Sequence, residues 1–376
     1  MKKFSLEIVG LVILTTIISC EHIDDFIGHG GSTTNKIESI EFLDEYVLPD
    51  GAAYANTTVG GLSAIDYADG KWYMISDDPK APIRFYTADI SFGENQFKEV
   101  TINGVTELLN GSNLPFSDDE IDPEAIRITP GGSVLWSSEG NVKGGVDPFV
   151  RVAGLDGTYK SSIALSEKFK VSGDENRGPR HNGVIEGLSV SYDKKGYWAS
   201  MELPLVQDGP EPVLEDTDSP VRIAYINSSG AFGKEFAYEL DPIARKFDES
   251  SFTVNGVVEI LEYDMDRFLV LERSFSTGYA DGGNNVKIYD VDASKATDVS
   301  HMDSLKGADY TRATKKLVFD FETVRNQLTD GVVDNIEGIT FGPQLENGNR
   351  SLVLVADNNF SAFGPQLNQF ILLEVK

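Results

Sequence analysis

The chain has 376 residues, 40% hydrophobic and 24% charged, enough apolar material for two average domains or one large repeat fold. Its 60 acidic and 32 basic residues give a formal net charge of -28, which argues against nucleic acid as a partner and against charge-driven binding to anionic membrane surfaces. Such a charge suits cations, or serves to keep the protein soluble. One cysteine, Cys20, excludes an intramolecular disulfide.

The N-terminal residues indicate export. Lys2 and Lys3 precede an apolar run, residues 8–18, which is too short for a comfortable membrane span and typical of a signal-peptide core. Ser19 and Cys20 at the end of this run are similar to the lipobox of bacterial lipoproteins, where the cysteine is acylated and becomes the new N-terminus. The alternative is an ordinary signal peptide with a coincidental cysteine.

We therefore expect a lipoprotein signal peptide over residues 1–19 and a flexible polar tether over residues 20–36. The protein would be lipid-anchored to the outer membrane of a bacterial cell envelope. The acidic residues that follow the cysteine, 21–25, resemble a signal for exposure on the cell surface. Contact with the membrane would be through the lipid anchor only.

From residue 37 onward, strand patterns recur and long helical patterns are few. Five units follow one plan: a strand, a tight turn, a second strand, then outer strands. The paired inner strands are expected over residues 61–78, 122–139, 184–204, 255–273 and 335–359. Four strands per unit at a spacing of several tens of residues are the signature of a β-propeller.

The last unit shows only three strands, and the unpaired segment 37–48 would supply its fourth. Closing the ring with strands from both ends of the chain removes the exposed edges of a linear array. We therefore predict an all-β fold, with a single five-bladed propeller domain over residues 37–376. A sixth blade hidden in the long fourth interval, or an open sandwich or solenoid, are the alternatives.

In a propeller, the start of each innermost strand and the end of the next strand lie on the same face, near the axis. Here the strand starts carry Glu124, Glu186 and Glu337. The strand ends carry Asp77, Asp78, Glu139, Glu202, Glu272 and Asp357. The first and fourth units lack an acid at the strand start. We expect these carboxylates to converge on one acidic mouth, although the alternative is that they end strands or lie in solvated loops.

Converging carboxylates repel one another unless cations or arginines lie among them. Hard cations such as Ca²⁺ take several carboxylate and carbonyl oxygens, so Ca²⁺ is the expected cofactor. A zinc site is disfavoured because the chain has one cysteine and four histidines. Arginine beside bound Ca²⁺ suits a phosphate or carboxylate ligand. The expected substrate-binding residues are Arg84, Arg180, His181, Arg273 and Asn358.

The same segments carry a family resemblance. They include Gly60-Gly61-Leu62-Ser63, Asp122-Pro123-Glu124, Ile185-Glu186-Gly187-Leu188, Leu271-Glu272-Arg273-Ser274-Phe275, Ile336-Glu337-Gly338 and Asp357-Asn358-Asn359-Phe360. In order, and over about residues 40–375, they resemble the bacterial and plant phytase-like family, "esterase-like activity of phytase". Ala125 departs from the usual glycine. The resemblance implies a secreted or envelope protein linked to phosphoester hydrolysis, with acidic residues as its catalytic groups.

The leading hypothesis is therefore an envelope-anchored, metal-assisted phosphoester hydrolase, phytase-like or phosphodiesterase-like. Glu186, Glu202 and Glu272 are the expected catalytic residues. The expected metal ligands are Asp77, Asp78, Glu124, Glu139, Glu337 and Asp357. One alternative is a non-catalytic ligand-binding or scaffold propeller with structural Ca²⁺, and another is a Ca²⁺-dependent carboxylester or lactone hydrolase. The expected partner is a small phosphorylated or ester substrate, bound by a monomer.

Overall fold

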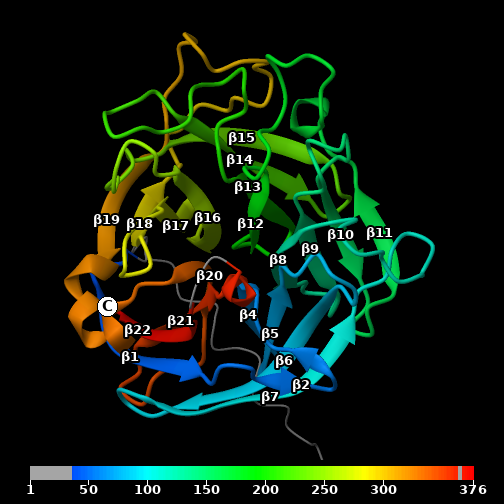
Figure 1. The fold of residues 1–376 in the computed structure, drawn as a ribbon. Helices are drawn as coiled ribbons and strands as arrows, with labels where there is room; N and C mark the ends of the chain where they lie inside the picture. The colour runs from blue at the N-terminus through cyan, green and yellow to red at the C-terminus, as the bar shows by residue number, and fades with distance from the viewer. Residues whose placement is uncertain (1–35, 363–365) are drawn as a thin grey trace, which may run out of the picture. The chain divides into compact units, whose positions relative to one another are not determined.

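A computed structural model of the protein describes residues 36–362 and 366–376. The predicted signal peptide, Cys20 and nearly all of the tether lie outside these residues. Residues 36–376 form one compact unit, made of five four-stranded antiparallel sheets and one short hairpin. Figure 1 shows the sheets arranged around a centre, with β4, β8, β12, β16 and β20 innermost. The described residues contain no helix long and apolar enough to cross a membrane.

Each sheet is one propeller blade. Blade 1 comprises β4 (Leu62–Ala68), β5 (Lys71–Ser76), β6 (Arg84–Phe92) and β7 (Phe97–Glu107). Blade 2 comprises β8 (Pro123–Ile128), β9 (Val134–Ser138), β10 (Phe149–Ala153) and β11 (Tyr159–Ile163). Blade 3 comprises β12 (Ile185–Val190), β13 (Gly196–Met201), β14 (Pro220–Asn227) and β15 (Phe232–Glu239). Blade 4 comprises β16 (Thr253–Asp264), β17 (Arg267–Ser276), β18 (Asn284–Asp292) and β19 (Thr314–Asp320).

Blade 5 joins the two ends of the described chain. It comprises β20 (Asn335–Phe341), β21 (Arg350–Asp357), β22 (Asn368–Val375) and β1 (Ile40–Leu48). β1 pairs antiparallel with β22, from Ile40 opposite Val375 to Leu48 opposite Asn368. The predicted closure and the count of five blades are confirmed. The remaining elements are the hairpin β2 (Ala53–Tyr54) with β3 (Thr57–Thr58) and the 3-10 helices η1 (Glu167–Phe169), η2 (Phe321–Thr323), η3 (Arg325–Gln327), η4 (Thr329–Gly331) and η5 (Asn359–Ser361).

The hydrophobic core lies between neighbouring blades because successive strand residues point to opposite faces. In β17, Leu269 and Leu271 pack with residues of blade 5, whereas Phe268 and Val270 pack with residues of blade 3. Every blade can therefore bury both faces. Fully burying a side chain of this size stabilises the fold by roughly 1.5–3 kcal/mol.

A buried ion pair fills the centre of the ring and ties the blades together. The Arg127 guanidinium lies 2.6 Å from the Glu259 carboxylate, and both residues are almost fully buried. The Glu259 carboxylate also accepts a hydrogen bond from the Leu188 main-chain nitrogen at 2.8 Å. Arg127 donates to the main-chain carbonyl of Ile126 on its own strand, β8, and to those of Ile65, Ile260 and Ile339 on β4, β16 and β20. These contacts place one residue of each inner strand at the same height along the ring axis: Ile65, Ile126, Leu188, Ile260 and Ile339. Equivalent residues of the five blades can be identified by counting along each strand from these positions.

Candidate metal and active centre

Each inner strand has a β-bulge just above the level of the Arg127 pair. Pairing with the second strand skips one residue in four blades, between Leu62 and Ala64, Ile185 and Gly187, Val257 and Glu259, and Ile336 and Gly338, and two residues in blade 2, between Pro123 and Ile126. The extra residue of a bulge is unpaired and its side chain is re-aimed. Glu124, Glu186 and Glu337 occupy this position, which explains why three predicted strand-start acids converge. Ser63 and Val258 occupy it in blades 1 and 4.

The second strands supply the other side chains of the centre. In three blades the residue paired just before the bulge is Ser76, Met201 or Ala356, and an acid follows each of them. Those acids are Asp77, Glu202 and Asp357, and Glu139 is the equivalent residue of blade 2. In blade 4 the residue in the paired position is Glu272, opposite Val257, so the following residue, Arg273, takes the place of the acid.

The structure therefore corrects the expected position of Glu272. Neighbouring residues on a strand point to opposite faces, so an offset of one residue turns a side chain away from the mouth. The Glu272 carboxylate accepts hydrogen bonds from the Tyr238 hydroxyl, from Asn255 Nδ2 at 3.1 Å and from Lys315 Nζ at 2.7 Å. Glu272 thus lies in a separate network between blades 3 and 4, apart from the other predicted acids.

Arg273 instead lies among the acids. Its Nη2 atom is 3.0 Å from Glu337 Oε1 and 3.6 Å from Glu202 Oε1. Arg273 Nε is buried and has no hydrogen-bond partner in the described part of the chain. The guanidinium therefore offsets part of the negative charge and retains an unpaired donor.

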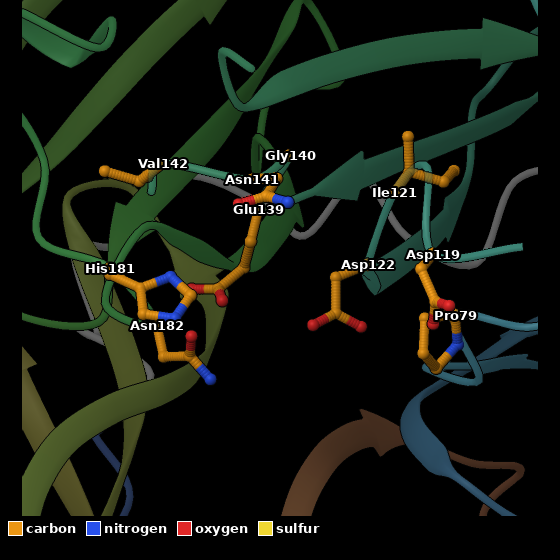
Figure 2. A pocket seen from close by; sticks show the side chains of 10 residues that line it. All are labelled: Pro79, Asp119, Ile121, Asp122, Glu139, Gly140, Asn141, Val142, His181 and Asn182. Atoms are coloured by element: carbon orange, nitrogen blue, oxygen red, sulfur yellow. The ribbon is translucent and has the colours of Figure 1, made fainter. Parts of the chain in front are cut away.

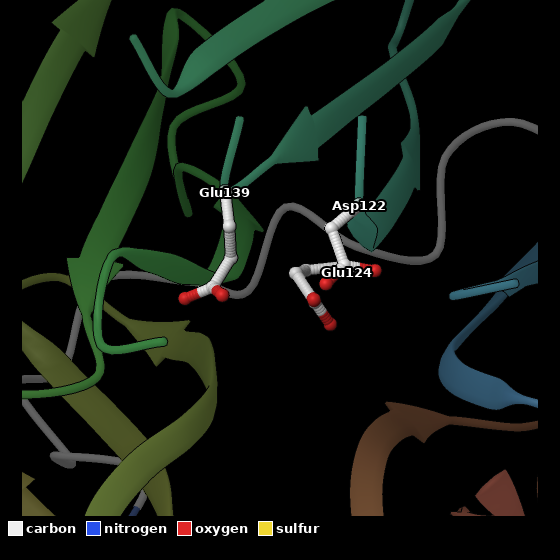
Figure 3. Close-up of side chains that lie close together, drawn as sticks. All are labelled: Asp122, Glu124 and Glu139. Carbon is white, nitrogen blue, oxygen red and sulfur yellow. The ribbon is translucent and has the colours of Figure 1, made fainter. Parts of the chain in front are cut away.

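Eight carboxylates around this arginine form what we call the acidic cluster: Asp77, Asp122, Glu124, Glu139, Glu186, Glu202, Glu337 and Asp357. Two groups of three could each hold a metal ion, because one oxygen from every member lies within 4.8 Å of the others. The first group is Asp122, Glu124 and Glu139 (Figure 3), and the second is Glu139, Glu186 and Glu202. Both consist of carboxylates alone, a donor set that fits a hard cation and not zinc.

Burial shifts the ionisation of the cluster. It raises the pKa of Asp122 to about 7, an effect to which nearby Glu139 and Asp357 add. Burial also raises the pKa of Glu202 and of Glu337 to about 8, although the Arg273 charge acts in the opposite direction on both. Without a bound cation, several members therefore keep a proton at neutral pH. A cation would stabilise the ionised carboxylates and displace those protons.

Burial also raises the pKa values of other carboxylates in the acidic cluster. The pKa values of Asp77, Glu124 and Glu186 lie well above the usual range because of burial, and the negative charges of neighbouring acids raise them further. The pKa of Asp357 rises only to about 6, because hydrogen bonds from the Asn359 nitrogen and the Asn335 side chain favour its ionised form. The acidic cluster thus contains members that differ in proton affinity.

A cavity of about 140 Å³ opens beside the first group of three carboxylates (Figure 2). His181, Asn141 and Asn182 border it together with Asp122 and Glu139. Burial and the charge of Lys143 lower the pKa of His181, which favours a neutral imidazole at neutral pH. His181 is therefore a predicted substrate-binding residue that the structure places next to the acidic cluster.

Four other predicted site residues are engaged in structural contacts. Arg84 is buried and pairs with Asp78 at 3.0 Å, so neither of these two predicted site residues is free. Arg180 donates to Glu211 at 3.0 Å and to two loop carbonyls. Asn358 Oδ1 accepts from the Gly61 main-chain nitrogen at 2.9 Å, which links blades 5 and 1. These contacts shape the loops around the mouth.

Two residues of the centre were not predicted as site residues. Asp122 completes the first group of three, and Asn335 Nδ2 donates to Glu337 Oε1 at 3.0 Å and to Asp357 Oδ2 at 3.1 Å. Each residue precedes a predicted acid by two positions, Glu124 or Glu337. That spacing of two residues from a predicted acid was the available signal.

Residues 57–360 match the Phytase-like family, described as "Esterase-like activity of phytase", and the chain belongs to this family. A search of curated proteins gave no match. Among solved structures, an endo-arabinase from Bacteroides thetaiotaomicron has 10% sequence identity and a TM-score of 0.45, covering 83% of this chain and 93% of its own. A thermostable family-43 glycoside hydrolase has 9% identity and a TM-score of 0.47, covering 88% and 96%. Similarities this weak do not inform the activity of this chain.

Proposed function

We propose that the protein is a metal-assisted phosphoester hydrolase, with Ca²⁺ bound in the acidic cluster. The observation that carries the proposal is the pair of buried carboxylate groups that share Glu139, with the Arg273 guanidinium alongside. Membership of a family described by the esterase-like activity of phytase supports hydrolytic chemistry. The choice of a phosphoester and of Ca²⁺ rests on the donor set and on the arginine.

Each group has a role that follows from its position. Asp122, Glu124 and Glu139 would hold the cation. Bound Ca²⁺ supplies positive charge that polarises a phosphoryl oxygen and makes a water molecule more acidic. Arg273 has a free Nε donor and would hydrogen-bond the phosphoryl oxygens. Glu202, which burial keeps protonated at neutral pH, would donate a proton to the leaving oxygen, and neighbouring Glu186 would position it.

The test uses the purified protein with phytate and with bis-p-nitrophenyl phosphate, after EDTA treatment and after Ca²⁺ is returned. We expect hydrolysis of at least one substrate only when Ca²⁺ is present, and its loss in Glu124→Gln and Glu139→Gln. The matched control is Glu272→Gln, which removes a buried carboxylate outside the acidic cluster. Folded protein that hydrolyses neither substrate with Ca²⁺ present would count against the proposal.

Carboxylester or lactone hydrolysis is a second candidate, because the family description names an esterase-like activity. A panel of p-nitrophenyl acetate and simple lactones, measured under the same conditions, separates the two. If EDTA lowers the melting temperature but no ester of either kind is hydrolysed, the acidic cluster is a structural Ca²⁺ site in a ligand-binding propeller.

We also propose that the mature chain is anchored to the outer membrane through a lipid on Cys20, supported by the sequence pattern around that residue. Mass spectrometry of protein expressed in a bacterial host tests this directly. We expect an N-terminal peptide that begins at Cys20 with attached acyl chains, and none from Cys20→Ala.

A further inference from the structure

The inner hairpin of blade 4 extends beyond the acidic cluster. β5, β9 and β13 each end at the residue before the acid that they present. β17 instead continues past Arg273 to Ser276, and its partner β16 begins at Thr253. At about 3.3 Å per residue, the hairpin rises roughly 10 Å past the level of Arg273. It therefore forms a wall on one side of the mouth.

Two aromatic residues at this extension form what we call the aromatic wall: Phe275 of β17 and Phe252, which directly precedes β16. Phe275 lies two residues after Arg273 on the same strand, hence on the same face. Its ring centroid is 6.3 Å from that of Phe252. Phe252 is 61% exposed. Large apolar side chains gathered in the open beside a polar site are typical of ligand-binding surfaces.

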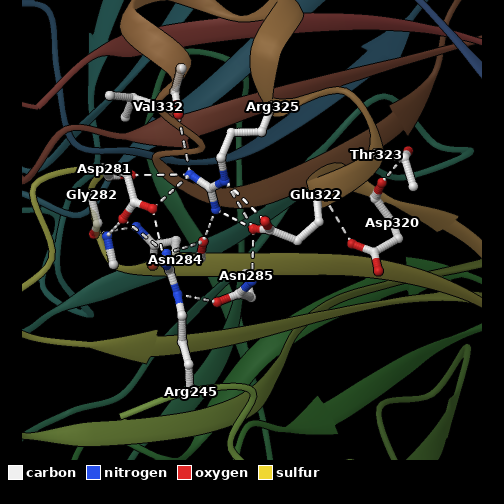
Figure 4. A network of polar contacts seen from close by, with 12 residues as sticks. Arg245, Asp281, Gly282, Asn284, Asn285, Asp320, Glu322, Thr323, Arg325 and Val332 are labelled. Atoms are coloured by element: carbon white, nitrogen blue, oxygen red, sulfur yellow. Dashed lines mark hydrogen bonds and ion pairs between the residues drawn. The ribbon is translucent and has the colours of Figure 1, made fainter. Parts of the chain in front are cut away.

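A charged network braces the loop that follows β17 (Figure 4). The Arg245 guanidinium stacks 4.1 Å from the Tyr279 ring centroid and binds both carboxylate oxygens of Asp281, at 2.8 and 2.9 Å. Arg325 donates to the Asp281 carbonyl at 3.1 Å and so links this loop to η3. The loop after β17 is therefore braced, which lowers the cost of ordering it around a ligand.

The segment before β16 and the loop after β17 are also joined to each other. The Phe252 main-chain nitrogen donates to Thr277 Oγ1 at 3.0 Å, and the Thr277 nitrogen donates to the Phe252 carbonyl at 3.1 Å. Phe247 lies on the opposite face of β17, because its main-chain N–H donates to Ser276 Oγ at 3.2 Å and Ser276 alternates with Phe275 along the strand. The surface that continues outward from Arg273 therefore consists of Phe275 and Phe252.

We propose that the aromatic wall binds the organic group of an anionic ester while Arg273 and the cation at the acidic cluster hold its charged group. This inference rests on the proposed function and narrows its substrate class to phosphoesters with a planar or apolar organic group. Aromatic side chains stack favourably on such groups. Phytate does not match this class, since phosphates surround its ring, and the acidic surface of the protein repels so highly charged an anion.

The test measures binding of two non-hydrolysable probes, phenylphosphonate and methylphosphonate, by calorimetry to the purified protein with Ca²⁺ present. Both carry the anion, and only one carries a ring. We expect the wild-type protein to bind phenylphosphonate roughly tenfold more tightly, and this ratio to fall close to one in Phe252→Ala. Phe252→Tyr should retain the preference. Leu155→Ala, which removes an exposed apolar side chain between β10 and β11, is the matched control.

The outcomes separate this inference from the proposed function. If the wild-type protein binds the two probes with equal affinity, the aromatic wall is not a binding surface. The same holds if folded Phe252→Ala keeps the wild-type ratio of the two affinities. Neither result contradicts the anion site. If neither probe binds, the anion site of the proposed function fails and this inference fails with it. Thermal melting of each variant confirms that it is folded before its ratio is compared.

Discussion

Arg273 sits where four other blades place an acid, and this one exchange changes the chemistry of the centre. It contacts Glu202 and Glu337 directly, and its charge acts against the burial that raises their pKa values. A fifth acid in its place would leave the centre with carboxylates alone. With the arginine present, the centre can attract an anionic group and a cation to the same place.

We predict that Arg273→Gln lowers the free energy of unfolding by about 3 kcal/mol at pH 8 without added cation, since it leaves two buried glutamates without their partner. The loss should be smaller at pH 5.5, where Glu202 and Glu337 take up protons instead. Urea denaturation at both pH values measures this. Arg180→Gln is the control, because its partner Glu211 is largely exposed and such pairs contribute about 0–1 kcal/mol. Equal losses for the two variants would contradict the assigned role.

Two buried glutamates, one inside and one outside the acidic cluster, give a second prediction. Glu124→Gln should weaken Ca²⁺ binding by about tenfold or more, because it removes an ionisable oxygen from the group of three carboxylates that would hold the cation. Glu272→Gln should leave the affinity unchanged and lower only the melting temperature, since it breaks contacts to Lys315 and Asn255. Calorimetric titration of Ca²⁺ into both variants gives the comparison. A similar loss of affinity in Glu272→Gln would show that the strand offset has been misassigned.

At the scale of the elements, strand patterns and repeat spacing were sufficient to predict the blades and their closure. They also placed Glu124, Glu186 and Glu337 correctly, since each lies at a bulge that aims it inward. Glu272 was misplaced because a repeat pattern locates a strand but not its register, and an offset of one residue reverses the side chain. The register of β17 depends on the bulge at Val258, which has no charge or glycine to mark it.

The β1 strand makes an independent prediction about ring closure. A chain that begins at residue 49 should expose the whole edge of β22 and lose the pairing of Ile40–Leu48. Compared with a chain that begins at residue 36, we expect the melting temperature to fall by more than roughly 10 °C and oligomers to form through the open edge. Thermal melting and size-exclusion chromatography measure both effects. An unchanged monomer with an unchanged melting temperature would mean that β1 is dispensable for closure.

In the whole molecule, the Arg127–Glu259 pair contacts all five inner strands below the mouth. The acidic cluster therefore lies directly above a point where the five blades are bonded to one another. The blades cannot move apart easily to relieve repulsion among its carboxylates. Proton uptake or a bound cation must relieve it instead. The stability of the whole fold should therefore depend on both pH and cation.

The direction of that dependence follows from the raised pKa values. In the folded protein the pKa is about 7 for Asp122 and about 8 for Glu202 and Glu337, whereas an ordinary carboxyl group has a pKa near 4. At pH values between these limits, the folded protein therefore binds more protons than the unfolded chain. Stability then falls as pH rises, because the proton-binding difference sets the slope. We predict that the melting temperature of cation-free protein drops by roughly 5 °C or more between pH 5.5 and 8.5.

Millimolar Ca²⁺ should remove most of this drop and stabilise the protein most at pH 8.5, where the cation displaces the fewest protons. Differential scanning calorimetry across the pH range, with EDTA or with Ca²⁺, tests both statements, and Mg²⁺ at the same concentration tests selectivity for the larger cation. A cation-free melting temperature that is flat or rises over this range would mean that the cluster does not keep its protons in solution. The buried carboxylates would then be stabilised by charges or hydrogen bonds other than those that Arg273 and Asn335 supply.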